Sequence, residues 1–228
     1  MRGLATAPKR MCPSLFGKAP PGGELLPVPA ADTGCGAAAS ENRGERGPDM
    51  QYTSQYRSPI GEILLACDET GLTGLWFEGE RFYAQGLDSE HDQRETPVFE
   101  ETKRWLSIYF SGKEPGFLPP LHKRGSPFQL CVWELLQQIP YGETTTYGEL
   151  AKQVAAKRKV ERMSAQAVGG AVGHNEISII VPCHRVVGAN GSLTGYAGGV
   201  DKKAALLRLE GVHLEAAGLF LPTRGTAL

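Results

Sequence analysis

The stretch Val181-Pro182-Cys183-His184-Arg185-Val186-Val187 places a thiol, an imidazole and a guanidinium on consecutive residues. The stretch follows directly on the apolar run 177–181, which shares Val181 with it and whose β-branched composition predicts a buried strand. Pro182 fixes its own φ, lacks an N–H and restricts the residue before it, so the chain must turn where the cysteine begins. A reactive side chain that leaves a rigid element at a turn indicates a site, and Cys183 is its candidate nucleophile.

A cysteine after an apolar run also has a simpler interpretation, because free cysteine is among the most buried residue types and packs as a small hydrophobe. The neighbours of Cys183 favour a reactive thiol instead. Cationic groups such as His184 and Arg185 lower the pKa of a thiol from about 8.5, which increases the thiolate that acts as nucleophile. A Cys-His step on its own fits both interpretations.

The composition is that of a globular chain without a membrane segment. Its 228 residues can hold one large domain or two small ones, and 41% hydrophobic residues are enough for a core. No stretch approaches the roughly 18 apolar residues of a membrane span, and the first residues lack the apolar core of a secretion signal. The cysteines form no CxxC pair, which favours a reducing compartment and predicts a cytoplasmic protein. They are Cys12, Cys35, Cys67, Cys131 and Cys183.

The net charge of −1 hides a division along the chain. Residues 50–120 carry 6 Lys and Arg against 12 Asp and Glu, a balance of −6, whereas residues 121–210 carry 11 against 7, a balance of +4. A phosphate backbone would therefore be met by the second part. A solvated basic face without function would have the same composition.

Residues 1–49 are rich in Gly, Pro and Ala and show no sustained period, which predicts disorder because they cannot bury enough apolar surface. They are either a disordered arm or an upstream mis-start of the chain. From Met50 the pattern turns globular. Two apolar runs, 60–67 and 72–77, are joined by Asp68-Glu69-Thr70-Gly71 and predict a hairpin. A helix is expected over 97–110, and Gly112 ends it.

Past the Pro-rich link at 115–121, three helices are expected. Ser126 is a good N-cap for the first, and Pro140 to Gly142 end it. Thr146 with Glu149 three residues on predicts a capping box for the second, and Ser164 starts a third that is rich in Ala and Gly. The last two helices suggest a helix-turn-helix, although helix pairs of this kind are common.

The segments around the cysteine extend the pattern. MSAQAVGGAVGHN at 163–175 runs into PCHRV, and GANGSLTGYAGG at 188–199 follows it. Together these motifs closely resemble the O6-alkylguanine-DNA alkyltransferase family, also called methylated-DNA–protein-cysteine methyltransferases. The resemblance covers Ser126 to about Val212, and a looser one extends back to Met50.

The resemblance implies an α+β fold, in which a small ribonuclease-H-like α/β domain precedes a mostly helical, winged-helix-like alkyltransferase domain with a helix-turn-helix. The corresponding domains are 50–120 and 121–215, with a tail at 216–228. The implied activity is single-turnover DNA repair: a methyl or larger alkyl group moves from O6 of a flipped guanine in duplex DNA to Cys183. O4 of thymine stays open as a second position. No cofactor or metal is expected, and the partner is damaged duplex DNA, bound through its minor groove by a monomer.

By resemblance, four further residues have catalytic roles. His184 is the base, acts through a water, and is oriented by Glu210. Tyr147 supports the flipped nucleotide and donates a proton to the base, and Asn175 braces the turn that carries the cysteine. Read without the family, Tyr147 is a half-buried aromatic, His184 a packed histidine, and Asn175 a helix C-cap.

The DNA-binding and pocket residues also follow the family pattern. In many members an arginine near the start of the recognition helix enters the base stack, but Gln166 stands there in this chain. It can wedge and hydrogen-bond without bringing a charge, and the longer basic turn before it could supply phosphate contacts: Lys157, Arg158, Lys159 and Arg162. The expected DNA-binding residues are Ser164, Gln166, Ala167, Gly170 and Arg185, and the expected guanine pocket is Tyr196, Ala197 and Gly198.

Three other classes of protein are alternatives to this interpretation. Alkyltransferase-like proteins flag damaged guanines without repairing them, but they lack the cysteine of the intact PCHRV motif. A methylation-sensing transcription regulator would carry a metal-binding cysteine cluster upstream, where residues 1–49 hold only Cys12 and Cys35. A cysteine hydrolase would have no affinity for DNA.

Overall fold

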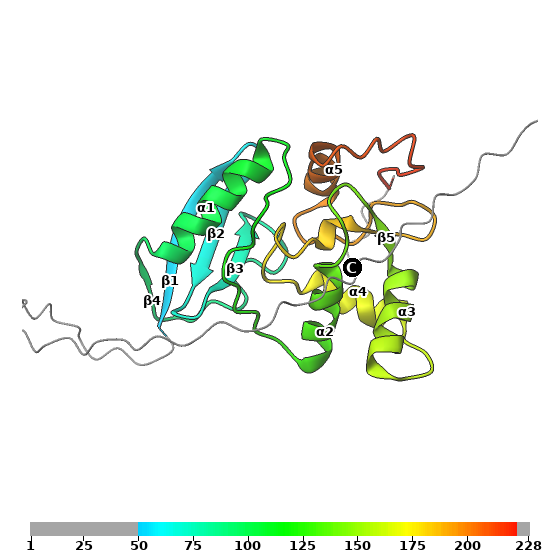
Figure 1. Ribbon diagram of the computed structural model, residues 1–228, viewed down its shortest axis with the longest axis horizontal. Coiled ribbons are helices and arrows are strands. Elements are labelled where there is room, and N and C mark those ends of the chain that lie inside the picture. The colour runs from blue at the N-terminus through cyan, green and yellow to red at the C-terminus, as the bar shows by residue number, and fades with distance from the viewer. Residues whose placement is uncertain (1–49, 223–228) are drawn as a thin grey trace, which may run out of the picture. The chain divides into compact units, whose positions relative to one another are not determined.

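The computed structural model describes residues 50–222, so the predictions for residues 1–49, with Cys12 and Cys35, and for 223–228 lie outside it. The described chain begins with a four-stranded sheet in the order β3-β2-β1-β4 (Figure 1). Strands β1 (Gln51–Ser58), β2 (Gly61–Cys67) and β3 (Leu72–Phe77) pair antiparallel, whereas β4 (His91–Gln93) runs parallel to β1.

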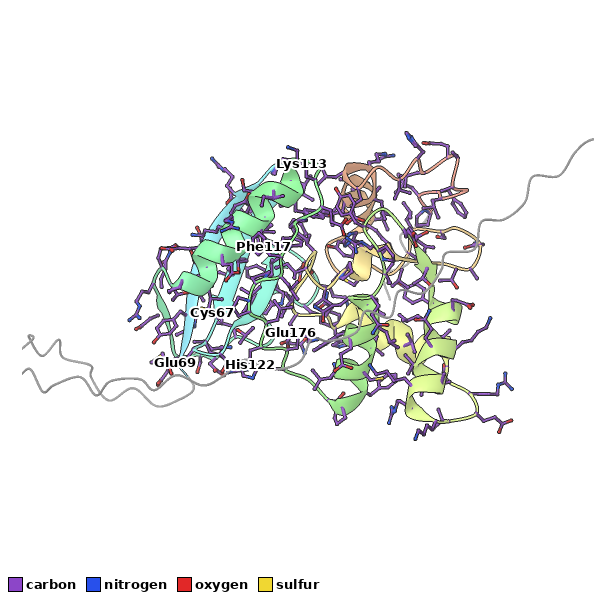
Figure 2. All side chains as sticks on the ribbon, in the orientation of Figure 1. Cys67, Glu69, Lys113, Phe117, His122 and Glu176 are labelled. Atoms are coloured by element: carbon purple, nitrogen blue, oxygen red, sulfur yellow. The ribbon has the colours of Figure 1, made fainter. Side chains whose placement is uncertain are left out.

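The predicted hairpin between β2 and β3 is confirmed, and Asp68 closes its turn. One carboxylate oxygen accepts hydrogen bonds from the backbone N–H groups of Thr70 (2.8 Å) and Gly71 (3.0 Å), as aspartate does in tight turns. The other oxygen pairs with His122 (2.5 Å) and Arg124 (2.8 Å). Figure 2 shows His122 and Glu69 at the same end of the sheet. The link that follows α1 is thereby fastened to the hairpin.

The sequence did not predict β1, because this strand lacks an apolar alternation. Gln51, Thr53 and Ser54 are buried polar residues within it. Partners come from distant parts of the chain: the Gln51 carbonyl oxygen, for example, accepts a hydrogen bond from the Asp88 N–H at 2.6 Å. A buried strand of this composition is stable only because such partners exist.

Helix α1 (Pro97–Phe110) has the predicted bounds and lies across one face of the sheet (Figure 1). Thr96 caps it, with its side chain accepting from the Phe99 N–H at 3.3 Å. Its buried side is Phe99, Thr102, Trp105, Leu106 and Tyr109. Val98 and Phe110, at the edges of this side, are half-buried.

The three predicted helices of the second part are present: α2 (Pro127–Leu136), α3 (Tyr147–Arg158) and α4 (Ala165–Gly173). Ser126, Thr146 and Ser164 are their N-caps, as predicted, and α2 ends before Pro140, at Leu136. The capping box predicted for α3 forms only in part: Thr146 accepts from the Glu149 N–H, but the Glu149 carboxylate pairs with Lys152. The reciprocal box is found at α2, between Ser126 and Gln129. The short parallel strands β5 (Thr145–Thr146) and β6 (Val186–Val187) pair, and α5 (Val200–Leu209) completes the regular elements.

The predicted strand over 177–181 is wrong. The run is buried, but it forms turns, and its one strand-like contact is an isolated bridge between Ile177 and Leu75 of β3. The Leu75 N–H donates to the Glu176 carbonyl at 2.7 Å, and Glu176 is labelled beside the sheet in Figure 2. Ile179 has a φ of 69°, which no regular strand allows. An apolar run is buried in a turn as well as in a strand, so the hydrophobic pattern does not distinguish the two.

The fold class is confirmed as α+β, with a sheet unit followed by a helical unit. One core cluster continues through both, for example from Leu75 and Tyr109 to Val168 and Val181. The proposed division between residues 120 and 121 stays a prediction. No helix within residues 50–222 is long and apolar enough to cross a bilayer.

Candidate active site

Cys183 begins a single helical turn, η1 (Cys183–Arg185), directly after Pro182. Its side chain belongs to the core cluster, and the residue is only 5% exposed. The backbone N–H donates to the Val181 carbonyl at 2.8 Å, which bends the chain sharply at this point. The expected turn is therefore present, and it places the thiol inside the protein.

Asn175 holds this turn together. Its amide Nδ2 lies 2.8 Å from the Val181 carbonyl, 3.2 Å from the Ile177 carbonyl and 3.2 Å from the Cys183 sulfur. Its Oδ1 accepts from the Ile177 N–H at 3.1 Å. Asn175 thus bonds to both ends of the 177–181 run, at Ile177 and Val181, and supports the cysteine where a strand was predicted.

Burial raises the pKa of the Cys183 thiol to about 11. The hydrogen bond from Asn175 and the charge of Lys203 lower the pKa, whereas the charge of Glu80 raises it further. The resting side chain is consequently a neutral thiol near pH 7. For this thiol to act as a nucleophile its proton must leave, which requires a base close by.

His184 is the adjacent candidate base, and it is completely buried. Its Nε2 lies 2.7 Å from Oε1 of Glu210, an acceptor, so Nε2 carries the ring proton. Nδ1 then holds the free lone pair, and this atom has no hydrogen-bond partner within residues 50–222. Burial lowers the pKa of His184 although Glu210 opposes that effect, so the ring is neutral and can accept a proton.

Glu210 follows α5 and gathers donors from distant parts of the chain. Besides His184, Oε1 accepts from the Tyr109 hydroxyl at 2.8 Å, and Oε2 accepts from the Gly142 N–H at 3.1 Å. Burial alone would raise the pKa of this carboxyl, but the bonds from His184 and Arg185 outweigh it and lower the pKa to about 2. Glu210 is therefore a fixed anion behind the histidine.

Arg185, expected at the DNA, has its guanidinium turned inward. Nε and Nη2 form a two-pronged contact with the Glu210 carboxylate at 2.9 and 3.0 Å, and Nη1 donates to the Ile139 carbonyl at 2.6 Å. Its side chain is 11% exposed. A guanidinium held by three hydrogen bonds is committed to the protein, and the geometry supports a role in orienting Glu210.

Tyr147, at the start of α3, reaches across to the Gly-rich loop. Its hydroxyl donates to the carbonyls of Thr194 (3.2 Å) and Gly195 (3.1 Å). Burial raises its pKa well above the ordinary value, so the hydroxyl keeps its proton. Gly169 of α4 packs against the ring, since a Cβ there would lie 3.7 Å from it. Tyr147 thus links the helix pair to the loop.

The expected pocket residues lie together on this loop. Tyr196 is buried, whereas Ala197 and Gly198 are half-buried. The rings of Tyr196 and His184 meet edge to face, with centroids 6.5 Å apart. A side chain at position 198 would clash, because its Cβ would lie 2.8 Å from the Tyr196 ring. The loop therefore adjoins the cysteine turn, and its role as a guanine pocket stays a prediction.

Lys203 of α5 is part of the site, although the sequence analysis did not select it. It is fully buried, and its ammonium donates to the Val186 carbonyl (2.5 Å) and the Thr194 carbonyl (2.7 Å). Burial lowers its pKa to about 8, while a negative charge on Cys183, once the thiol ionises, acts in the opposite direction. The only signal in the sequence is that Lys203 lies among the Ala and Leu residues that form the apolar face of this helix.

The expected DNA-binding residues of α4 share one exposed face. Val168, Gly169, Ala171 and Val172 are buried, and the other side of the helix presents Ser164, Gln166, Ala167 and Gly170. A Cβ at Gly170 would meet nothing within 4 Å, so this surface is open. Helix α4 also packs on α3 and α2, which fixes the helix pair on the core.

Residues 50–222 contain no group of three His, Cys, Asp or Glu arranged to hold a metal.

Comparisons with known proteins match both parts of the chain. Residues 51–122 match the 6-O-methylguanine DNA methyltransferase ribonuclease-like domain, and residues 127–212 match the DNA binding domain of the same enzyme. The methylated-DNA–protein-cysteine methyltransferase of Methanosarcina acetivorans is 47% identical over 160 residues, covering 70% of this chain and 98% of the relative. The corresponding Haemophilus influenzae protein is 41% identical, covering 70% and 86%.

A solved structure agrees with the sequence matches. The crystal structure of Mycobacterium tuberculosis OGT in complex with DNA has a TM-score of 0.60 at 42% identity, and the match covers 71% of this chain and 92% of that one. The resemblance drawn from the motifs around Cys183 is confirmed. The chain belongs to the family of the 6-O-methylguanine DNA methyltransferases.

Proposed function

We propose that this protein repairs duplex DNA by transferring a methyl or larger alkyl group from O6 of guanine to Cys183, once per molecule. The observation that carries the proposal is the arrangement of a buried thiol beside a neutral histidine whose ring is fixed by an ionised glutamate. The same arrangement borders the loop of Tyr196 and the helix pair α3 and α4. Nucleophile, base and nucleic-acid surface therefore belong to one site.

The proton of Cys183 leaves toward His184. Nδ1 of that ring holds the free lone pair, and a bridging water carries the proton from sulfur to nitrogen, as the family resemblance implies. Glu210 stabilises the imidazolium that forms, since its carboxylate already accepts from Nε2 at 2.7 Å. Because burial opposes a standing thiolate, deprotonation and attack proceed together.

The sulfur then attacks the alkyl carbon. The new S–C bond forms as the C–O6 bond breaks, and the electron pair of that bond stays on the guanine. Tyr147 supplies a proton to the leaving base, which requires its hydroxyl to exchange the Thr194 and Gly195 carbonyls for the base. The proton that His184 took from the thiol then returns to the Tyr147 phenolate by way of water, so both residues end in their starting protonation states. The product is unmodified guanine and a thioether at Cys183.

The damaged nucleotide must leave the base stack to reach this thiol, at a cost of about a few kcal/mol. The exposed face of α4 is the surface for this step, with Gln166 in its first turn. We assign Ser164, Gln166, Ala167 and Gly170 to minor-groove contact and Arg185 to the support of Glu210. The small residues allow the helix to approach the backbone closely.

A thioether is chemically stable, so the reaction ends with the first transfer. The protein needs no cofactor for this step, because the sulfur is both nucleophile and final acceptor. A monomer on duplex DNA is sufficient, since one chain provides every group named above.

The test is intact-protein mass spectrometry after incubation with excess duplex containing O6-methylguanine, followed by peptide mapping. We expect the mass of one methyl group, on Cys183, with no second addition. Cys183→Ala should bind the damaged duplex without gaining mass, and Cys131→Ala, which removes a half-buried thiol elsewhere, should react normally. Methyl transfer by Cys183→Ala would refute the assignment of Cys183 as the nucleophile.

A further inference from the structure

The segment 213–221, near the end of the described chain, folds back onto the loop that leads to the predicted guanine pocket. The Phe220 N–H donates to the Gly191 carbonyl at 3.1 Å, and the Leu193 N–H donates to the Phe220 carbonyl at 3.0 Å. These bonds form a short parallel bridge. The two backbones approach so closely that a Cβ at Gly191 would lie 2.1 Å from the Gly218 carbonyl oxygen. The contact is therefore made by the backbone.

A second, smaller hydrophobic cluster supports this bridge. Leu214 and Leu219 of the segment are buried. They pack with residues of β6, of α5 and of the start of the pocket loop: Val187, Leu193, Ala204 and Leu207. Phe220, by contrast, is 47% exposed, so it contributes its backbone and not its side chain. The two leucines fix the segment on the fold, and the Phe220 backbone binds the loop.

The residue after Leu193 carries a carbonyl that the active site uses. The Thr194 carbonyl accepts from the Tyr147 hydroxyl at 3.2 Å and from the Lys203 ammonium at 2.7 Å. Tyr196, the buried aromatic of the predicted pocket, is two residues further on. A displacement of Leu193 would therefore move both the acceptor of Tyr147 and the wall of the pocket.

The sheet unit fixes the other end of the pocket loop. The Arg81 N–H donates to the Ala197 carbonyl at 3.2 Å. A Cβ at Gly198 would lie 3.5 Å from the Phe77 ring, so the loop and the end of β3 are in contact. Between these contacts and the bridge the loop is only three residues long. It can yield to a large group in the pocket only if one of its two ends is released.

We propose that residues 213–221 clamp the base of the pocket loop and thereby limit the size of the alkyl group that Cys183 can accept. The inference rests on the proposed alkyl transfer to Cys183. It gives a role to a segment beyond the family match, which ends at Val212. A fixed loop keeps the Tyr196 ring against that of His184, with centroids 6.5 Å apart. The clamp therefore favours methyl, because a larger group must displace a wall that is held in place.

Phe220→Pro tests the proposal, since it removes the N–H that donates to Gly191 and leaves the buried leucines in place. Single-turnover rates are measured with two duplexes, one containing O6-methylguanine and one containing O6-benzylguanine. We expect methyl transfer to slow by about tenfold, because the loop no longer holds the base in line with the thiol. The benzyl-to-methyl ratio of the rates should rise by about threefold to tenfold, because the pocket can widen. Hydrogen exchange at the Leu193 amide should accelerate by about tenfold.

Phe220→Ala is the matched control, because it removes an exposed side chain and keeps the backbone N–H. It should change neither the ratio of the rates nor the hydrogen exchange. A second comparison avoids the proline: a chain that ends at Gly218 lacks the bridge, and a chain that ends at Pro222 keeps it. Only the shorter chain should show the raised ratio.

A purely structural role would lower both transfer rates by the same factor and leave their ratio unchanged, and that result would overturn the proposal. Loss of the native fold in both Phe220→Pro and the chain ending at Gly218, seen by circular dichroism, would overturn it too. If the unchanged protein transferred neither group, the proposed function itself would fail, and this inference would fail with it.

Discussion

Glu210 joins parts of the chain that are far apart in the sequence. Its carboxylate accepts from His184, Arg185, Tyr109 and the Gly142 backbone, which lie on η1, on α1 and in the turn before α3. Every one of these donors restrains the carboxylate, and the carboxylate in turn fixes the tautomer of His184. A change at this residue therefore alters the base without touching the thiol.

Glu210→Gln should slow methyl transfer by about a hundredfold or more, since general-base catalysis commonly contributes that much. The amide no longer stabilises the imidazolium, and it leaves the guanidinium of Arg185 without its anion. Single-turnover rates with O6-methylguanine duplex, measured beside binding, separate the two effects. Glu215→Gln, an exposed change nearby, is the control. A Glu210→Gln rate within twofold of that of the unchanged protein would contradict the role of Glu210 in supporting His184 as the base.

At the scale of single residues, the sequence predicts contacts between residues that are neighbours in the chain and misses contacts between residues that are far apart in it. Cys183 and His184 are neighbours in the chain, so their chemistry is visible in the motif. Tyr109 is 101 residues from Glu210, and no local pattern connects them. Lys203 was missed for the same reason, because the carbonyls that hold its ammonium come from Val186 and Thr194.

Among the elements, α1 and the turn at 177–181 show where pattern reading works. The bounds of α1 could be predicted because Pro97 and Gly112 mark its ends and its apolar residues repeat at helical spacing. The run 177–181 is apolar at almost every position, which fits a strand and a buried turn equally. The side chain of Asn175 decides between them, and hydrogen bonds of this kind are not visible in a hydrophobic pattern.

Helix α4 carries a prediction at the same scale. Gln166→Arg adds a positive charge to its exposed first turn, so binding to undamaged duplex should tighten and the slope of log K against log salt should steepen by about one. Titrations of duplex DNA at several salt concentrations measure both quantities. Gln153→Arg places the same charge on an exposed position of α3 outside the proposed face. Equal slopes for the two variants would argue against α4 as the DNA-binding helix.

Across the whole molecule, the sheet unit and the helical unit meet at the site. The sequence predicted both units. The hydrogen bond from the Arg81 N–H, just after β3, to the Ala197 carbonyl of the Gly-rich loop could not be predicted, because more than 110 residues of chain separate the two segments. Their meeting also means that titration in one unit affects the stability of the whole fold.

Acid unfolding should depend on Glu210. Its pKa lies near 2 in the folded protein, below the ordinary value of 4.5, so the folded state binds fewer protons than the unfolded state between these values. Its stabilising contribution, up to about 3 kcal/mol, is complete above pH 4.5 and is lost as the pH falls toward 2. His184 acts in the same direction, since its lowered pKa makes the unfolded state bind its proton first below about pH 6.5.

Glu80 has the opposite sign. Because its pKa is raised from 4.5 to about 7, the folded state binds the extra proton, and stability declines as the pH rises through that window. Urea unfolding from pH 3 to 8 should therefore show Glu210→Gln approaching the unchanged protein in stability as the pH falls below 4.5. Glu80→Gln should gain on the unchanged protein between pH 4.5 and 7. Parallel curves for all three proteins would mean that neither carboxyl is coupled to folding, and the buried charges would then lack the energetic role that their contacts imply.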